Sequence, residues 1–403
     1  MKLLPTRFKG SFYASIRPLA QSNRAGAAII LIAVMLFTAG AEAQSVKPQT
    51  VAGGLSAPWA VAFLPEGRFL VTERDGDMRV IQPDGKVGSP IAGVPKVDAV
   101  NQGGLLDLLL DSDFARNRTL YFCYSEPSPG TFSRGNSTAL ASATLSTDNT
   151  RLENVKVIFS QKPKFASSAH FGCRIVESRG PGLNSPPDGN LFLTLGDRFS
   201  RKEDAQTLGN HHGKIVRINK DGSTPADNPF VGKAGALPEI WSIGHRNLQG
   251  AVSTPDGTLW THEHGPQGGD EINLPKPGAN YGWPVITYGE NYGGGPVSDG
   301  LTAKAGLEQP LHYWVPSIAP SGMTFLTSDK YGKAWQGNLF IGSLKFAYLA
   351  RLELSSPYSG KVVKESKLLQ GVGRIRDVRQ GPDGLLYVLT DSSDGKLIRL
   401  LPG

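Results

Sequence analysis

The sequence is short of charged residues and of cysteine. Charged side chains make up 19 % of its 403 residues, below the ~25 % that is usual in globular proteins, and only two residues are cysteine. It nevertheless contains 6 Trp, 11 Tyr and 17 Phe. That apolar content is enough to build a core, which excludes an intrinsically disordered protein.

The motifs of several common enzyme classes are also missing. There is no GxxxxGK[ST] phosphate loop and no GxGxxG segment between a strand and a helix, so nucleotide cofactors are unsupported. There is no GxSxG nucleophile elbow. The histidines and cysteines lack the spacing of zinc ligands, which disfavours transition-metal chemistry.

Glycine and proline, in contrast, are abundant. They contribute 49 and 29 of the 403 residues, about 19 % together, where average usage gives about 12 %. Both residues break helices, which argues against a helical bundle or a coiled coil. We expect a turn-rich, all-β globular protein with a large core.

The first 43 residues have the pattern of an export signal. They hold five basic side chains and one acidic one, which leaves 37 basic and 34 acidic side chains, a net +3, on the remainder. That balance indicates no nucleic-acid partner. The 15-residue apolar run Ala27–Ala41 leads into Ala41-Glu42-Ala43, which fits the small-x-small cleavage rule. As a helix it would span about 22 Å, short of a ~30 Å hydrocarbon core.

We therefore predict a cleaved signal over residues 1–43 and a single catalytic domain over residues 44–403. The mature protein would be periplasmic or secreted, with no stable membrane span after cleavage. A short retained anchor is the alternative.

The two cysteines lie in apolar, strand-like segments. Export would place Cys123 and Cys173 in an oxidising compartment, where they could pair. Pairing requires Cα atoms about 6 Å apart, which a sequence does not reveal. Because free cysteine is commonly buried as an unpaired thiol, we favour free thiols and keep a disulfide as the alternative.

One element recurs six times along the chain: a turn rich in Gly, Asp or Asn, followed by a short strand. The copies lie at 65–74, 115–125, 187–198, 255–264, 336–345 and 382–391. Most are followed by a second strand, as at 78–85, 214–222, 348–354 and 396–403.

Such a hairpin cannot bury both of its faces alone. Spacings of about 47–80 residues suit four-stranded blades arranged radially. We predict an all-β fold, a six-bladed β-propeller of four-stranded antiparallel blades, closed by pairing of the C-terminal strand with the N-terminal one. A β-sandwich or two stacked β domains are the alternatives.

Unusual polar residues lie at or just after the repeated strands, so we expect them around one end of the central channel. His170 lies beside Gly172, which would let a flat ligand approach, and a histidine suits general-base chemistry. By itself, however, a lone strand histidine is more often structural. The segment GHRNLQG (244–250) offers Arg and amide groups for an anionic ligand, with an inter-blade ion pair as the alternative.

Two arginines alternate in GRIRDV (373–378). Arg374 and Arg376 would point to one face of a strand, where their repulsion calls for a negative group between them. Lys345 would add a third positive charge. Together with Arg246 they indicate a ligand with several carboxylates; solvent exposure or pairing with Asp377 or a similar acid is the alternative.

The loop EHGPQGGDEIN (263–273) suits calcium. It combines Glu263, Asp270 and Glu271 with glycine and proline, and Ca²⁺ prefers carboxylate and backbone oxygens in tight loops.

Taken together, these segments resemble the soluble, pyrroloquinoline quinone (PQQ)-dependent sugar dehydrogenases of the aldose (glucose/sorbosone) type. The resemblance runs from about Gly54 to Gly403. Its most specific segments are 58–74, 101–117, 244–250, 263–273, 280–284, 316–323 and 373–378. The fold of that family is a six-bladed propeller.

The resemblance implies an exported quinoprotein that oxidises aldoses at the anomeric carbon to lactones. His170 would be the general base that takes the hydroxyl proton while hydride passes to PQQ. The backbone carbonyls of Gly265 and Pro266 would hold a Ca²⁺ that polarises the quinone, and Glu271 with the backbone of Tyr281 would hold a second one. Nine residues would contact PQQ: Gln102, Arg246, Asn247, Tyr292, Ser343, Leu344, Lys345, Arg374 and Arg376. PQQ is a tricarboxylate, which would account for the cations.

The sequence also departs from the family pattern. Cys173 stands where a small Ser-like residue is expected, Leu248 replaces a proline, and segment 205–214 carries a double histidine. The partners implied are a small aldose and an unidentified electron acceptor. Two other functions stay open: a calcium-dependent propeller lactonase or hydrolase, and a non-catalytic propeller that binds a carbohydrate or a protein.

Overall fold

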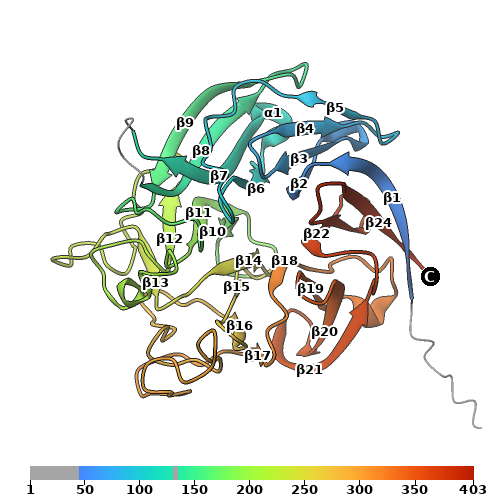
Figure 1. Ribbon diagram of the computed structural model, residues 1–403. Coiled ribbons are helices and arrows are strands. Elements are labelled where there is room, and N and C mark those ends of the chain that lie inside the picture. The colour runs from blue at the N-terminus through green and yellow to red at the C-terminus, as the bar shows by residue number, and fades with distance from the viewer. Residues whose placement is uncertain (1–44, 130–134) are drawn as a thin grey trace, which may run out of the picture. The chain divides into compact units, whose positions relative to one another are not determined.

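The computed structural model describes residues 45–129 and 135–403 (Figure 1). The predicted signal over residues 1–43 lies outside them. Within the described residues, no helix has the length and apolarity needed to cross a membrane.

The described strands form six four-stranded antiparallel sheets. The first three sheets are β2 (Pro58–Phe63), β3 (Phe69–Glu73), β4 (Met78–Ile81) and β5 (Val87–Pro90); β6 (Leu105–Leu110), β7 (Thr119–Pro127), β8 (Asn136–Leu145) and β9 (Leu152–Ser160); and β10 (Gly172–Arg179), β11 (Pro187–Leu195), β12 (Lys214–Asn219) and β13 (Ile240–Ile243).

The other three sheets are β14 (Leu248–Ser253), β15 (Leu259–Glu263), β16 (Asp270–Asn273) and β17 (His312–Trp314); β18 (Pro320–Phe325), β19 (Leu339–Ser343), β20 (Tyr348–Ser356) and β21 (Ser359–Leu368); and β22 (Ile375–Gln380), β23 (Leu386–Thr390), β24 (Gly395–Pro402) and β1 (Val46–Leu55). Helical turns in the described residues are short: α1 (Phe114–Asn117) and the 3₁₀ turns Pro65–Gly67, Lys202–Gln206 and Lys333–Trp335.

The sheets are arranged as the blades of a propeller, as predicted. The first strand of each sheet, from β2 to β22, lies nearest the centre of the ring in Figure 1, and neighbouring innermost strands contact one another. All six copies of the repeat lie on the second strand of a blade. The ring closes where β1 pairs with β24, from Val46 opposite Pro402 to Leu55 opposite Gly395.

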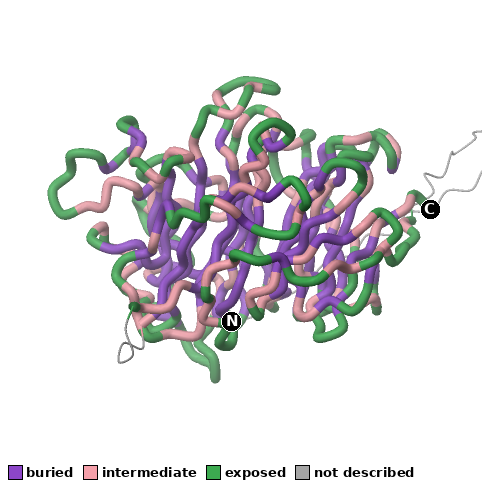
Figure 2. The backbone as a smooth tube through the Cα atoms, turned by 90° about the horizontal axis from the view of Figure 1, so that it is seen from above, coloured by how far each residue is buried: buried purple, intermediate pink, exposed green. Residues whose placement is uncertain are grey.

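The core follows from the pattern of the strands. Second strands such as β3, β19 and β23 are buried along their whole length, because they are covered by neighbouring blades on both faces. Figure 2 shows buried residues running through the strands and exposed residues in the loops at their ends. The loops at one end are therefore free to build a site.

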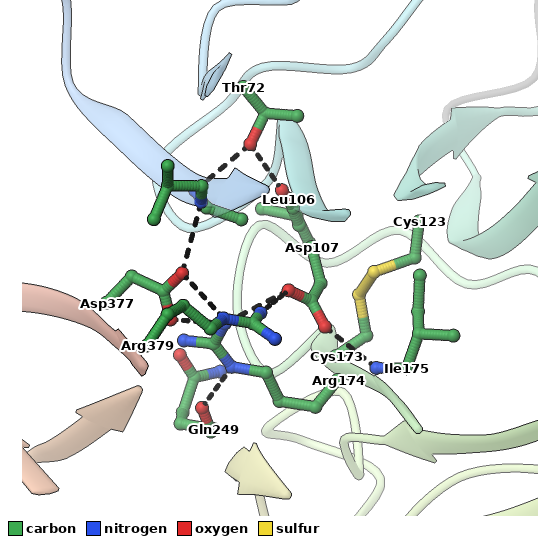
Figure 3. A network of polar contacts seen from close by, with 12 residues as sticks. Thr72, Leu106, Asp107, Cys123, Cys173, Arg174, Ile175, Gln249, Asp377 and Arg379 are labelled. Carbon is green, nitrogen blue, oxygen red and sulfur yellow. Dashed lines mark hydrogen bonds and ion pairs between the residues drawn. A yellow bond between two sulfur atoms is a disulfide. The ribbon is translucent and has the colours of Figure 1, made fainter. Parts of the chain in front are cut away.

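The two cysteines form a disulfide, so the expectation of free thiols was wrong. Cys123 on β7 is bonded to Cys173 on β10, with Cα atoms 6.8 Å apart (Figure 3). The two residues belong to neighbouring blades. Their proximity arises from the ring and is not visible in the local sequence.

Candidate active site

A large polar cavity lies at the end of the ring where the second strands finish. Its volume is about 910 Å³, within the range of cofactor and substrate pockets. Four of its lining residues, Arg74, His264, Leu344 and Asp391, directly follow the second strand of a blade. The sequence analysis predicted that the unusual polar residues lie at this position, just after the repeated strands.

Nine of the fourteen predicted site residues line this cavity. They are Gln102, Asn247, Gly265, Pro266, Tyr292, Leu344, Lys345, Arg374 and Arg376. None of the other five residues lines it. His170 and Ser343 line neither this cavity nor the smaller one beside it. Arg246, Glu271 and Tyr281 line that smaller cavity, which Gly265 also borders. The motifs scattered over 275 positions of sequence therefore meet at one place.

The cavity is strongly cationic. Arg74, Lys345, Arg374 and Arg376 line it, against one carboxylate, Asp391. Arg374 and Arg376 share Oδ2 of Asp391, at 3.0 and 2.9 Å, so they point to one face as their alternation predicts. Asp391, and not the Asp377 considered from sequence, is their partner.

Three guanidinium groups at the site keep buried donors without a protein partner. In the described part of the chain, the Nε–H groups of Arg74, Arg246 and Arg376 are buried and donate to no protein acceptor. Burial lowers the pKa of Arg376, and the nearby Arg174 and Arg374 lower it further, against the opposing effect of Asp391. An anion with several acceptor oxygens is the ligand that this donor set fits.

His170 is held by Asp197 beside this cavity. It precedes β10, its backbone N–H donates to Oε1 of Gln102 at 2.8 Å, and its Nδ1 lies 2.6 Å from Oδ1 of Asp197. The Trp283 indole donates to the other oxygen of Asp197 at 2.8 Å. These bonds orient the imidazole so that Nδ1–H faces the carboxylate and Nε2 is left to accept a proton.

The surroundings keep His170 uncharged at neutral pH. Burial lowers the pKa of His170, and this effect outweighs the hydrogen bond that the imidazole donates to Asp197, which raises the pKa; the charge of Arg246 lowers it further. A neutral imidazole paired with a buried carboxylate is equipped to act as a general base.

The predicted calcium loop is built around Asp270. Its two oxygens accept the backbone N–H groups of Gly265, Ile318 and Ala319 and the hydroxyl of Ser317, at 2.8–3.0 Å. Three of these four bonds fall on Oδ2 and one on Oδ1, so the carboxylate shapes the loop by fixing its backbone. The Gly265 carbonyl accepts Nη1 of Arg246 at 2.8 Å.

Glu271 and Tyr281, the predicted second calcium position, line the small cavity of about 10 Å³ together with Glu263. Glu263 and Glu271 face each other across β15 and β16. Burial raises the pKa of Glu271 well above its usual range, and the neighbouring Glu263 adds to this. In the described residues, no three His, Cys, Asp or Glu side chains gather closely enough to hold a metal ion, so a calcium here would need backbone oxygens as well.

Two predicted residues have structural reasons for their identity. A Cβ at Gly172, where φ is +82°, would lie 2.5 Å from the Thr194 carbonyl oxygen, so strand packing already requires glycine there. The buried Ser343 hydroxyl donates to the Ile318 carbonyl at 2.8 Å and supports the loop beneath the cavity.

The centre of the ring is closed by a second cluster of charges (Figure 3). Arg174 contacts Asp107 and Asp377 at 3.0 and 2.9 Å, and Arg379 contacts the same two carboxylates at 2.5 and 3.0 Å. We call these four residues the central quartet. Trp59 lies between it and the cavity: it lines the cavity, and the Arg174 guanidinium lies 4.3 Å from its ring.

Sequence reasoning missed Arg74, Asp197 and Asp391. Arg74 and Asp391 directly follow β3 and β23, and Asp197 lies two residues after the end of β11. The same rule that drew attention to Lys345 would have found them. The pairing of Asp197 with His170, 27 positions away, had no local signal.

Comparison with known proteins agrees with this geometry. The family model described as glucose/sorbosone dehydrogenase matches residues 55–399. The aldose sugar dehydrogenase YliI of Escherichia coli is 42 % identical over 362 residues, covering 89 % of this chain and 93 % of the relative. Quinoprotein glucose dehydrogenase B of Acinetobacter calcoaceticus is 26 % identical over 88 % of this chain and 87 % of its own length.

A solved structure extends the comparison to a bound cofactor. The PQQ-bound aldose sugar dehydrogenase of Streptomyces coelicolor superposes with a TM-score of 0.70 at 26 % identity, over 89 % of this chain and 98 % of that one. This chain therefore belongs to the glucose/sorbosone dehydrogenase family of quinoprotein oxidoreductases.

Proposed function

We propose that this protein is an exported, PQQ-dependent aldose dehydrogenase that converts aldoses to lactones with His170 as the general base. The observation that carries the proposal is the buried His170–Asp197 pair beside a cavity lined by four cations and one carboxylate. The family assignment favours this function over the lactonase and the non-catalytic binding protein.

The residues present fit the cofactor. PQQ carries three carboxylates, and the cavity supplies Lys345, Arg374 and Arg376 together with a buried, unpartnered Nε on Arg376 within the described chain. Asn247 and Gln102 add oriented amides. When bound, PQQ supplies a two-electron acceptor for hydride.

The chain's own residues would handle the proton. Nε2 of His170 would take the proton of the anomeric hydroxyl as the C1–H bond breaks, and that hydrogen would pass with its electron pair to bound PQQ, so that the sugar becomes the lactone. Asp197 holds the tautomer and offsets the positive charge that forms on the ring. Arg246 would lie close to the quinone and to the calcium-binding carbonyls of Gly265 and Pro266.

Calcium is proposed at the two positions that the sequence indicated. Gly265 and Pro266 line the cavity and their backbone carbonyls would form the first position, while the side chain of Glu271 with the backbone of Tyr281 would form the second. A divalent cation would also relieve the repulsion between Glu271 and Glu263. Export rests on the signal-like residues 1–43, which lie outside the described residues, and places the enzyme in the periplasm or outside the cell.

Reconstitution tests the proposal. Purified apoprotein with PQQ and Ca²⁺ should reduce an electron-acceptor dye in the presence of glucose. His170→Gln should lower kcat by about 10²–10⁴-fold, the usual contribution of a positioned base, while PQQ titrations change little. His312→Gln, a half-buried histidine on β17 that does not line the cavity, is the matched control. Background activity across a panel of aldoses would overturn the proposal.

A further inference from the structure

Phe199 is a large apolar side chain held at the surface beside His170. It is 51 % exposed. Its φ is +65°, and that of Arg198 is +63°. Left-handed φ values are steric outliers for bulky side chains, and such strain persists where the surroundings over-determine it, often at functional sites. The fold therefore maintains this exposed ring at a cost.

The turn that carries Phe199 is anchored to the proposed base. The Phe199 N–H donates to Oδ1 of Asp197 at 2.8 Å, the same oxygen that contacts Nδ1 of His170. Arg198 points the other way: its guanidinium lies 3.7 Å from the centre of the Phe171 ring and donates to the Ser167 carbonyl at 2.7 Å. With Arg198 buried, Phe199 is forced outward.

The Phe199 ring lies between the base and Tyr292. Its centroid is 5.1 Å from that of His170 in an edge-to-face arrangement, and 6.4 Å from that of Tyr292 with the planes 24° apart. Tyr292 lines the cavity and is itself 62 % exposed. The two exposed rings, one of which lines the cavity, thus form an apolar wall beside the His170 imidazole.

We propose that this wall binds the C–H face of the aldose ring and that Phe199 is a specificity-determining residue. The proposal rests on the proposed function and names the substrate contact of the same site. A pyranose whose hydroxyls are equatorial presents axial C–H groups that pack on an aromatic ring. An epimer with an axial hydroxyl on that face would press an unpartnered polar group against the wall, which is unfavourable.

The test combines kinetics with a binding measurement on the holoprotein loaded with PQQ and Ca²⁺. Phe199→Ala should lower kcat/KM for glucose about two- to tenfold, mainly through KM, the loss expected for one stacking contact. It should also narrow the kcat/KM ratio between glucose and the epimers whose axial hydroxyl lies on the packed face, which are mannose and galactose for one face of the ring and allose for the other. Phe199→Trp should restore both. Tyr313→Ala removes an equally exposed aromatic ring that does not line the cavity and should change neither.

Saturation-transfer NMR of glucose on the same proteins separates the two proposals. If the wild type oxidises glucose and Phe199→Ala has the same KM and the same epimer ratios, the aromatic wall does not bind the sugar, and the proposed function is unaffected. If the wild type binds glucose without oxidising it and Phe199→Ala no longer binds glucose, the aromatic wall is supported and the proposed function is wrong. A wild type that neither binds nor oxidises aldoses overturns both.

Discussion

Two groups of arginines lie on either side of Trp59, and their surroundings differ. In the central quartet, two guanidiniums meet two carboxylates, and each carboxylate also accepts a backbone N–H, from Ile175 or Val61. In the cavity, Arg374 and Arg376 share the single carboxylate of Asp391. Strand β22 contributes to both groups, since it carries Arg376 and Arg379.

The contrast distinguishes the quartet, whose charges hold the blades together, from the cavity arginines, whose positive charge is available to a ligand. Burial raises the pKa of Asp377, but the neighbouring Arg174 and Arg379 lower it more, so the net shift of its pKa is downward. The quartet pairs two guanidiniums with two carboxylates, and it closes the centre of the ring between β6, β10 and β22. The cavity keeps a surplus of positive charge, and this is what a tricarboxylate would neutralise. The difference can be tested by breaking each group in turn.

Breaking the quartet should have the largest effect. Arg174→Met leaves Asp107 and Asp377 with only Arg379 as a cation, and removing one partner of a buried ion pair costs about 3–5 kcal/mol. Urea denaturation should show this loss in the free energy of unfolding. Arg116→Met, which breaks an exposed ion pair with Asp113, should cost less than about 1 kcal/mol. Equal losses in the two variants would show that the quartet has no special structural role; Asp107→Asn is the milder alternative if Arg174→Met does not fold.

Breaking the cavity group should affect binding and spare stability. Arg376→Gln removes a guanidinium that lies near two others, Arg174 and Arg374, so the free energy of unfolding should stay constant or rise. Affinity for PQQ should fall about 10–100-fold, the range for a lost hydrogen bond to a charged group. Titration of the apoprotein, followed by PQQ absorbance, measures it. Arg351→Gln, on β20 and away from the cavity, is the control; unchanged affinity in Arg376→Gln would contradict the ligand-binding role.

The two groups also differ in how far sequence could reveal them. The six turn-and-strand repeats predicted the propeller because hairpin turns have a strong local signature. Arg374 and Arg376 could be assigned to one face because strands alternate. The quartet could not be found, because Asp107 and Arg379 meet across 272 positions through the closure of the ring. The disulfide and the His170–Asp197 pair escaped for the same reason: each joins residues brought together only by packing.

A smaller effect should appear on acidification, outside both arginine groups. Burial lowers the pKa of six of the seven histidines: His170, His211, His212, His262, His264 and His312. Below about pH 6.5 these histidines bind protons in the unfolded chain but stay unprotonated in the folded protein. The stability that these neutral histidines contribute is therefore complete above pH 6.5 and is lost as the pH falls toward the folded values, which reach about 3 for His264.

His262 offers the sharpest single test of this pH dependence. It is fully buried on β15, and neither ring nitrogen has a hydrogen-bond partner in the described residues. His262→Leu removes one proton-binding site and leaves an apolar group of similar size, so stability at pH 7 should change little. The slope of unfolding free energy against pH between pH 6 and 4 should become shallower by up to about 1.4 kcal/mol per pH unit, the limit for one proton. His312→Leu, less deeply buried, should change the slope less; identical slopes in the wild type and His262→Leu would show that His262 is not the group that titrates.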